Sequence, residues 1–156
     1  MRFNPGAILA TLERHGVRYV LIGGLAANAH GVRRTTRDVD VIVDRADANL
    51  ERLASAAREL EVGSPVIDSE LQELDPLDPA DLRRAANVSL DTREGELDVM
   101  NDAKGAPPFE QLARRAVVVE VLGTRVPIAA LDDLIALKHA AGRDVDLRDI
   151  ADLTDR

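Results

Sequence analysis

Residues 17–44 read VRYVLIGGLAANAHGVRRTTRDVDVIVD, and this stretch decides the fold. The apolar, largely β-branched run at residues 17–22 predicts a strand that ends at Gly23-Gly24. Residues 25–30 then have the composition of a short helix, which the next glycine closes. The first half of the stretch therefore predicts a strand, a glycine turn and a helix in succession.

The second half of the stretch predicts another strand, residues 37–44, with two carboxylates on one face. Side chains two residues apart on a strand point the same way, so the α-carbons of Asp38 and Asp40 lie about 6.5–7 Å apart. Two like charges at that distance repel, and a bound divalent cation is the usual compensation. The pair is a candidate metal site, although a polar strand face beside a turn has the same letters.

A third carboxylate, Asp98, follows from a predicted hairpin whose strands are residues 88–91 and 96–100. If the second of these strands neighbours the Asp-x-Asp strand, Asp98 completes a set of three ligands. Three carboxylates around one or two magnesium ions form a site for phosphoryl transfer. One of the aspartates can also accept the proton of the attacking group.

The composition limits both the size of the protein and the chemistry of its metal. With 156 residues, 46% of them hydrophobic, the chain can bury one core, and we expect a single domain over residues 1–156. Cysteine is absent, which excludes disulfides, thiolate catalysis and cysteine-ligated zinc. The three histidines have no paired spacing, whereas Asp and Glu number 28, so Mg²⁺ or Mn²⁺ is the expected cofactor.

Charge and hydropathy indicate the environment in which the chain works. The formal net charge of −8 argues against broad, sequence-independent binding of nucleic acid, which depends on phosphate neutralisation. Only two phenylalanines and one tyrosine are present, too few for a base-stacking platform. No apolar run approaches the roughly 18 residues of a membrane span, and the N-terminus lacks a signal-peptide pattern. We therefore expect a cytoplasmic protein with no membrane partner.

The rest of the chain alternates helices and strands around an acidic segment. Residues 61–84 contain three prolines and predict a surface excursion, in which Asp78-Pro79 caps a short helix that ends at Arg84. The C-terminal part, from about residue 130, is helical. The other predicted elements are helices at 6–15, 45–60, 109–115, 128–139 and 147–153 and paired strands at 117–122 and 125–128.

The ordered combination of GGLA at 23–26 and DVD at 38–40 resembles the signature of the DNA polymerase beta-type nucleotidyltransferase superfamily. Within it, HG at 30–31 and RTTRDVD at 34–40 are similar to the abortive-infection nucleotidyltransferase toxins and their small relatives. KHAAGRDVDLRDI at 138–150 resembles the closing motif of that branch. Together these segments frame most of the chain.

The resemblance implies both a fold and an activity. The fold is α/β (α+β), a mixed, largely antiparallel sheet flanked by helices in a minimal nucleotidyltransferase arrangement. The activity is transfer of a nucleoside monophosphate from a nucleoside triphosphate to an acceptor. Asp38, Asp40 and Asp98 are the implied metal ligands and catalytic residues, with Asp98 as the candidate base.

Further site residues follow from the same resemblance. Lys138 would contact the triphosphate as a point charge, and Asp146 would hold the closing motif or assist catalysis. The glycine pair opens a helix whose amides can receive phosphate oxygens, and Arg143 either touches substrate or neutralises the acidic motif. The nucleotide-binding candidates are Gly23, Gly24, Thr36, Arg37, Lys138 and Arg143.

One departure from the superfamily pattern concerns the glycine pair. Many members have a hydroxyl residue directly after the first glycine, where this chain has Gly24 followed by Leu25. Because that hydroxyl helps to hold the triphosphate, its replacement leaves open how this chain binds the nucleotide.

Three functions remain open from the sequence. The leading one is transfer to a macromolecule, tRNA or protein, by the toxin of a toxin-antitoxin pair with a cognate partner protein. The second is a nucleotidyltransferase-like antitoxin or binding module with weak or no turnover. The third is a small-molecule nucleotidyltransferase of the aminoglycoside type, whose cationic substrates suit an acidic cleft. The chain has little room for the second helical domain that such enzymes usually carry.

Overall fold

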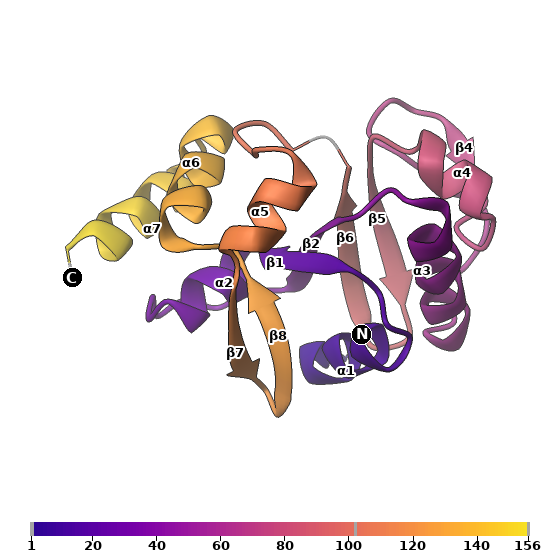
Figure 1. Ribbon diagram of the computed structural model, residues 1–156, viewed down its shortest axis with the longest axis horizontal. Helices are drawn as coiled ribbons and strands as arrows, with labels where there is room; N and C mark the ends of the chain where they lie inside the picture. Colours follow the sequence, from indigo (N-terminus) through magenta and orange to yellow (C-terminus); the bar gives the residue numbers. More distant parts are fainter. Residues whose placement is uncertain (1, 102, 156) are drawn as a thin grey trace.

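The computed structural model describes residues 2–101 and 103–155 and contains a mixed six-stranded sheet (Figure 1). Its strand order is β5-β6-β2-β1-β8-β7. The β2–β6 and β1–β8 pairs are parallel and the other three are antiparallel, which confirms the mixed, largely antiparallel sheet that the resemblance implies. The strands are β1 (Tyr19–Ile22), β2 (Asp38–Val43), β5 (Asn87–Thr92), β6 (Gly95–Met100), β7 (Val117–Val121) and β8 (Thr124–Ile128).

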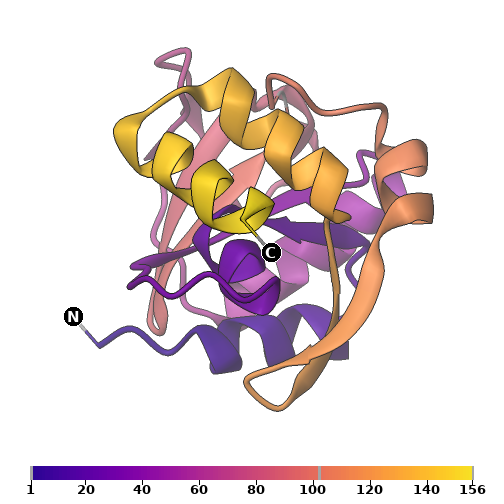
Figure 2. The ribbon, with the colours of Figure 1, turned by 90° about the vertical axis from the view of Figure 1, so that its left-hand side faces the viewer.

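Helices cover both sides of the sheet. α1 packs against β2, β6 and β8 and against α3, whereas α6 packs against α7 and α2. Figure 2 shows α6 and α7 together on the side of the molecule opposite α1. The helices are α1 (Pro5–Arg14), α2 (Gly23–Ala29), α3 (Asp47–Glu59), α4 (Pro79–Arg84), α5 (Phe109–Arg115), α6 (Leu131–Ala141) and α7 (Asp144–Thr154).

The two faces of β2 differ in polarity, because alternate residues point to opposite sides of a sheet. Val39, Val41 and Val43 are buried in the core. Asp38 and Asp40 are half-buried on the other face. The alternation of apolar and acidic residues predicted from the sequence is therefore confirmed in β2. It places the two carboxylates on the side of the sheet that carries α6.

The helix α2 begins at Gly23, two residues earlier than the sequence pattern predicts. Gly23 has a φ of +72°, a left-handed conformation that glycine adopts readily and that lets the chain leave β1 directly into the helix. At the other end, Nε2 of His30 lies 2.8 Å from the carbonyl oxygen of Ala129. That contact joins the end of α2 to the segment that precedes α6.

The acidic segment 61–84 is more ordered than the predicted surface excursion. It contains a short hairpin, β3 (Val66–Ile67) and β4 (Glu73–Leu74), followed by α4. Asp78 caps α4 as predicted, since its carboxylate accepts a hydrogen bond from the Ala80 amide at 2.9 Å. Leu74 and Leu82 are buried in the core and anchor the segment. The many charged residues around them hid this burial in the sequence pattern.

The C-terminal helices meet at Gly142, whose φ of +65° ends α6. α7 then begins at Asp144, three residues before the predicted start, because the Asp146 carboxylate accepts a hydrogen bond from the Arg143 amide at 3.2 Å. Among the described residues, no helix has both the length and the hydropathy needed to cross a membrane.

Candidate active site

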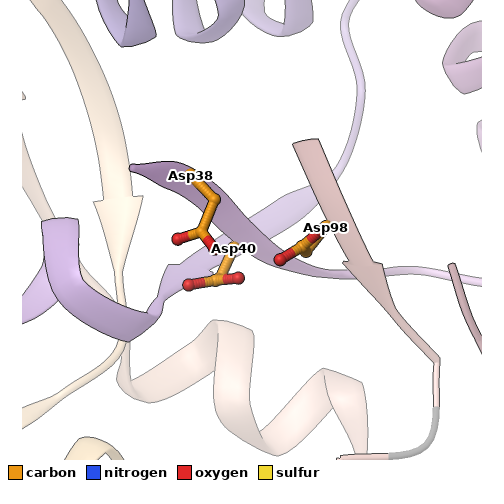
Figure 3. A group of neighbouring side chains, drawn as sticks. All are labelled: Asp38, Asp40 and Asp98. Carbon is orange, nitrogen blue, oxygen red and sulfur yellow. The ribbon is translucent and has the colours of Figure 1, made fainter. Parts of the chain in front are cut away.

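The parallel register of β2 and β6 assembles the acidic cluster. It places Asp40 opposite Asp98 and Asp38 opposite Glu96. Each of Asp38, Asp40 and Asp98 has a carboxylate oxygen within 4.8 Å of such an oxygen on the other two (Figure 3). The sequence analysis could only assume that the strand of Asp98 neighbours the strand of Asp38 and Asp40. The structure shows that β6 and β2 are neighbours, so the three carboxylates converge.

The glycine pair makes room for the side chains of this cluster. A β-carbon on Gly23 would lie 2.1 Å from Oδ2 of Asp40, well inside any permitted contact. A β-carbon on Gly24 would lie 2.8 Å from Oγ1 of Thr36. Both glycines therefore allow the start of α2 to approach β2 and the segment before it at distances that no other residue permits.

The charges of the cluster are poorly compensated by the protein. Burial, with the neighbouring charges of Asp38 and Asp98, raises the pKa of Asp40 to about 8. Burial and the charge of Asp98 also raise the pKa of Asp38, and the same two causes raise the pKa of Glu96 to about 7. Uncompensated carboxylates of this kind favour a bound cation.

The donor set fits a hard divalent metal. Oδ1 of Asp98 is buried and has no hydrogen-bond partner among the described residues, a costly state for a carboxylate oxygen unless it is a ligand. All the converging donors are carboxylate oxygens, which suit Mg²⁺ or Mn²⁺. Asp38, Asp40 and Asp98 are therefore the residues that would hold the metal.

The cluster opens into a cavity of about 510 Å³. Gly23 and Gly24 form part of its wall, and α6 contributes an apolar side through Leu134 and Leu137. Met100 and Asn87, on β6 and β5, lie on the wall as well. Four cationic side chains also line the cavity: Arg34, Lys104, Lys138 and Arg143.

Lys138 is buried in an ion-paired network, with 4% of its surface exposed. Its Nζ lies 2.7 Å from Oδ2 of Asp149 and 3.8 Å from Oδ1 of Asp146. Arg34 donates to the same Asp149 oxygen at 2.6 Å. Lys138 is therefore a buried, ion-paired lysine, although it lies in the last turn of α6.

Asp146 is the second acid of this network. Its carboxylate accepts a hydrogen bond from Nε of Arg143 at 2.7 Å. Burial opposes ionisation of Asp146, but the Arg143 hydrogen bonds outweigh it and hold the pKa below its ordinary value. The predicted closing motif is thus brought to the cavity wall, where Arg143 neutralises an acid and also faces the cavity.

Two predicted nucleotide-binding residues, Thr36 and Arg37, are not among the described residues that line the cavity. Arg37 is exposed and lies outside the described residues that line it. Thr36 packs against Gly24, and its hydroxyl donates to the carbonyl oxygen of Asp38 at 3.3 Å. In this structure Thr36 therefore shapes the turn before β2.

Polar residues of the site that the sequence did not single out include Asn87, Glu96 and Lys104. The alternation along β6, which places Glu96 on the face of Asp98, was the available signal for Glu96. Asn87 and Lys104 belong to no motif, so only their places in the fold reveal them.

Comparisons with known proteins support the resemblance at the level of the fold. No protein-family model matches the sequence, and no curated protein matches it significantly. Among solved structures, the lincomycin-bound lincosamide antibiotic adenylyltransferase LnuA superposes with a TM-score of 0.62 at 17% identity, over 97% of this chain and 96% of the other. The antibiotic-resistance factor ANT(2'')-Ia has a TM-score of 0.62 at 15% identity, over 95% and 79% of the two chains.

An inferred nucleotidyltransferase from Thermotoga maritima also superposes, with a TM-score of 0.59 at 18% identity over 96% of this chain and 90% of the other. The chain therefore has the nucleotidyltransferase fold. It is a minimal version, because the sheet, its flanking helices and the acidic cluster account for nearly all of the described residues.

Proposed function

We propose that this protein is a metal-dependent nucleotidyltransferase that transfers a nucleoside monophosphate from a nucleoside triphosphate to an acceptor hydroxyl. The observation that carries the proposal is the convergence of Asp38, Asp40 and Asp98 within 4.8 Å on the wall of the cavity. The nucleotidyltransferase fold of the chain supports the same reaction.

In the proposed reaction, the acceptor oxygen attacks the α-phosphorus and the bond to the β-phosphate breaks, so pyrophosphate leaves. Asp38, Asp40 and Asp98 would hold Mg²⁺ or Mn²⁺, which supplies charge stabilisation for the phosphoryl oxygens when bound. Asp98 accepts the acceptor proton, and its unpartnered Oδ1 supports that role.

We place the nucleotide against the wall that carries the glycine pair and the closing motif. Gly23 and Gly24 present backbone without side chains to the cavity. Lys138, Arg143 and Asp146 form the ion-paired part of that wall. Thr36 and Arg37 stay nucleotide-binding candidates on the basis of the resemblance alone.

For the acceptor, the first proposal is a macromolecule, tRNA or protein, modified by one component of a toxin-antitoxin pair. What supports it is the likeness of the motifs at residues 30–40 and 138–150 to that branch. The exposed Arg33 and Arg37 precede the acidic strand and could contact phosphates or acidic groups of such an acceptor.

A small-molecule acceptor is the second candidate, and one comparison specifically favours it. The argument against it was that the chain lacks room for a second domain. LnuA, however, aligns over 96% of its own length with this chain, so the lincosamide adenylyltransferase fold itself contains no large additional domain. The net charge of −8 also suits a cationic small molecule better than RNA.

Transfer can be tested directly with each α-labelled nucleoside triphosphate and Mg²⁺. Three acceptor mixtures separate the candidates: cellular RNA, cellular protein, and a panel of aminoglycosides and lincosamides. The control is Asp40→Asn, which keeps the shape of the side chain and removes its charge. Label carried only by the wild type supports the proposal and identifies the acceptor class. No label from any nucleotide, with a folded sample, supports the binding module instead.

A further inference from the structure

Lysine is rare in this chain, and both lysines line the same cavity. Of the 20 basic residues other than histidine, Lys104 and Lys138 are the only lysines in the sequence. Lys138 is buried between two carboxylates, whereas Lys104 is exposed in the loop that follows β6. The charge of the Lys138 ammonium group is therefore shared with two carboxylates, whereas the Lys104 ammonium group lies at the protein surface.

Of the four cations that line the cavity, three are committed to acids. Arg34 and Lys138 pair with Asp149, and Arg143 pairs with Asp146. Lys104 forms no ion pair with any described residue, although four aspartates line the same cavity. Among the described residues, Lys104 is thus the cavity-lining cation that no carboxylate neutralises.

A tight turn presents Lys104 to the cavity. The Ala106 amide donates to the carbonyl oxygen of Ala103 at 3.2 Å, which places Lys104 and Gly105 at the two central positions. Gly105 has a φ of +86°, the value that the second central residue of a type II turn requires. The direction in which Lys104 leaves the backbone is therefore set by the turn.

The turn is also held against α6 by close packing. A β-carbon on Gly105 would lie 2.7 Å from the carbonyl oxygen of Ala136 and 2.9 Å from Cβ of Ala140. No residue larger than glycine permits that approach, so the loop after β6 sits directly on the helix that carries Lys138. This contact explains how an exposed loop residue comes to line the cavity.

From these observations we propose that Lys104 contacts the β- and γ-phosphates of the bound nucleotide. Lys138 is then a positioning residue, which orients Asp146 and Asp149 from within the wall. An unpaired ammonium is a flexible donor with full charge, and it suits phosphate oxygens better than one already shared by two carboxylates. The inference rests on the proposed function, since it assigns a role within the same nucleotide site.

The test measures binding of two probes in Mg²⁺ by isothermal titration calorimetry. The probes are inorganic tripolyphosphate and the monophosphate of whichever nucleotide the wild type binds. Lys104→Met should weaken tripolyphosphate binding about 10-fold, as expected for loss of one charge-assisted contact. Binding of the monophosphate should stay within about twofold, and Lys104→Arg should retain most of the tripolyphosphate affinity.

Arg125→Met is the matched control, because Arg125 is exposed on β8 and its loss changes the net charge equally. Unchanged tripolyphosphate binding by Lys104→Met would overturn the proposal and leave the nucleotide site intact. An equal loss of monophosphate binding would also overturn it, by placing Lys104 at the α-phosphate or the nucleoside. If the wild type binds no nucleotide at all, the proposed function itself fails.

A second measurement needs no variant. Amine-selective labelling with peptide mass spectrometry can follow the two lysines separately, because each lies in a different segment of the sequence. Magnesium tripolyphosphate should slow the modification of Lys104 severalfold, while Lys138 should react slowly with or without it. Equal labelling of Lys104 in both conditions would contradict the phosphate contact.

Discussion

Oδ2 of Asp40 lies where a side chain on Gly23 would begin, 2.1 Å from the position of that missing β-carbon. The glycine at the start of α2 and the carboxylate on β2 are therefore parts of one arrangement. Gly23 allows α2 to start beside β2, and the Asp40 carboxylate occupies the space that a side chain on Gly23 would fill. A substitution at either residue should therefore change the position of the other.

Gly23→Ala should disrupt the acidic cluster. The new methyl group cannot coexist with Asp40 in its present position, so the carboxylate must move. A displacement of about 1 Å in a catalytic group can cost roughly 100-fold in rate. We expect a loss of at least that size in transfer, together with loss of the stabilisation by Mg²⁺ in thermal melts.

Gly123→Ala is the matched control for this change. Gly123 also has a positive φ, +87°, but a β-carbon there has no neighbouring atom within 4 Å. Both substitutions incur the cost of a left-handed alanine, about 1 kcal/mol. Only Gly23→Ala should alter Mg²⁺ binding, and an equal effect of the two variants would show that backbone strain is the cause.

The stability of the metal-free protein should fall as the pH rises from about 4 to about 8. Folding raises the pKa of Asp40 from an ordinary 3.8 to about 8, so the folded state binds a proton that the unfolded state releases across this interval. Because the folded state holds more protons there, unfolding becomes easier with increasing pH. Urea unfolding in EDTA at pH 5, 6.5 and 8 measures the trend.

Added Mg²⁺ should act in the opposite sense. Cation binding requires ionised carboxylates, so the rise in melting temperature on adding Mg²⁺ should be larger at pH 8 than at pH 6. Asp40→Asn should stabilise the metal-free protein at pH 8 and abolish the Mg²⁺ effect. A pH-independent Mg²⁺ effect would contradict the assignment of Asp40 as a ligand.

Lys138→Met should destabilise the fold as well as reduce activity. Both Lys138 and Asp149 are almost fully buried, and breaking such a pair leaves a charge without its partner. We expect a loss of about 3 kcal/mol in the free energy of unfolding, at the low end of the usual range because Arg34 still contacts Asp149.

The double variant Lys138→Met/Asp149→Leu separates pairing from packing. Since it removes both buried charges, it should recover most of the stability in urea titrations. Arg93→Met, which breaks a surface pair with Glu61, should have only a small fraction of the effect of Lys138→Met. A double variant as unstable as the single one would mean that Lys138 stabilises the protein through something other than this pair.

Gly105→Ala should weaken tripolyphosphate binding while leaving Lys104 in the sequence. The added methyl group meets the backbone of Ala136, so the turn must lift from α6 and carry Lys104 with it. An effect close to that of Lys104→Met, about 10-fold, is expected in the same titrations. Gly123→Ala again serves as the control for strain, and normal binding by Gly105→Ala would mean that the turn does not position the lysine.

The parts of the site that the sequence predicts are those governed by local spacing. The alternation along residues 38–43 placed Asp38 and Asp40 on one face, and the structure keeps them there. The alternation in β6 likewise identified Asp98, whose role still depended on an assumed neighbour. The helix starts at Gly23 and Asp144 were missed by two or three residues, because a positive φ and a side-chain cap are set by contacts at the helix ends.

What the sequence by itself determined is the order of elements, the two-residue spacing that pairs Asp38 with Asp40, and the motif that indicates a nucleotidyltransferase fold. Only the tertiary structure decided that Asp98 lies opposite Asp40, that Lys138 and Arg34 share Asp149, and that Gly105 rests on α6. The physical reason is the separation along the chain of the residues that interact. Spacing along one strand or helix follows from backbone geometry, whereas pairings between distant segments follow from strand register and close packing of the whole chain.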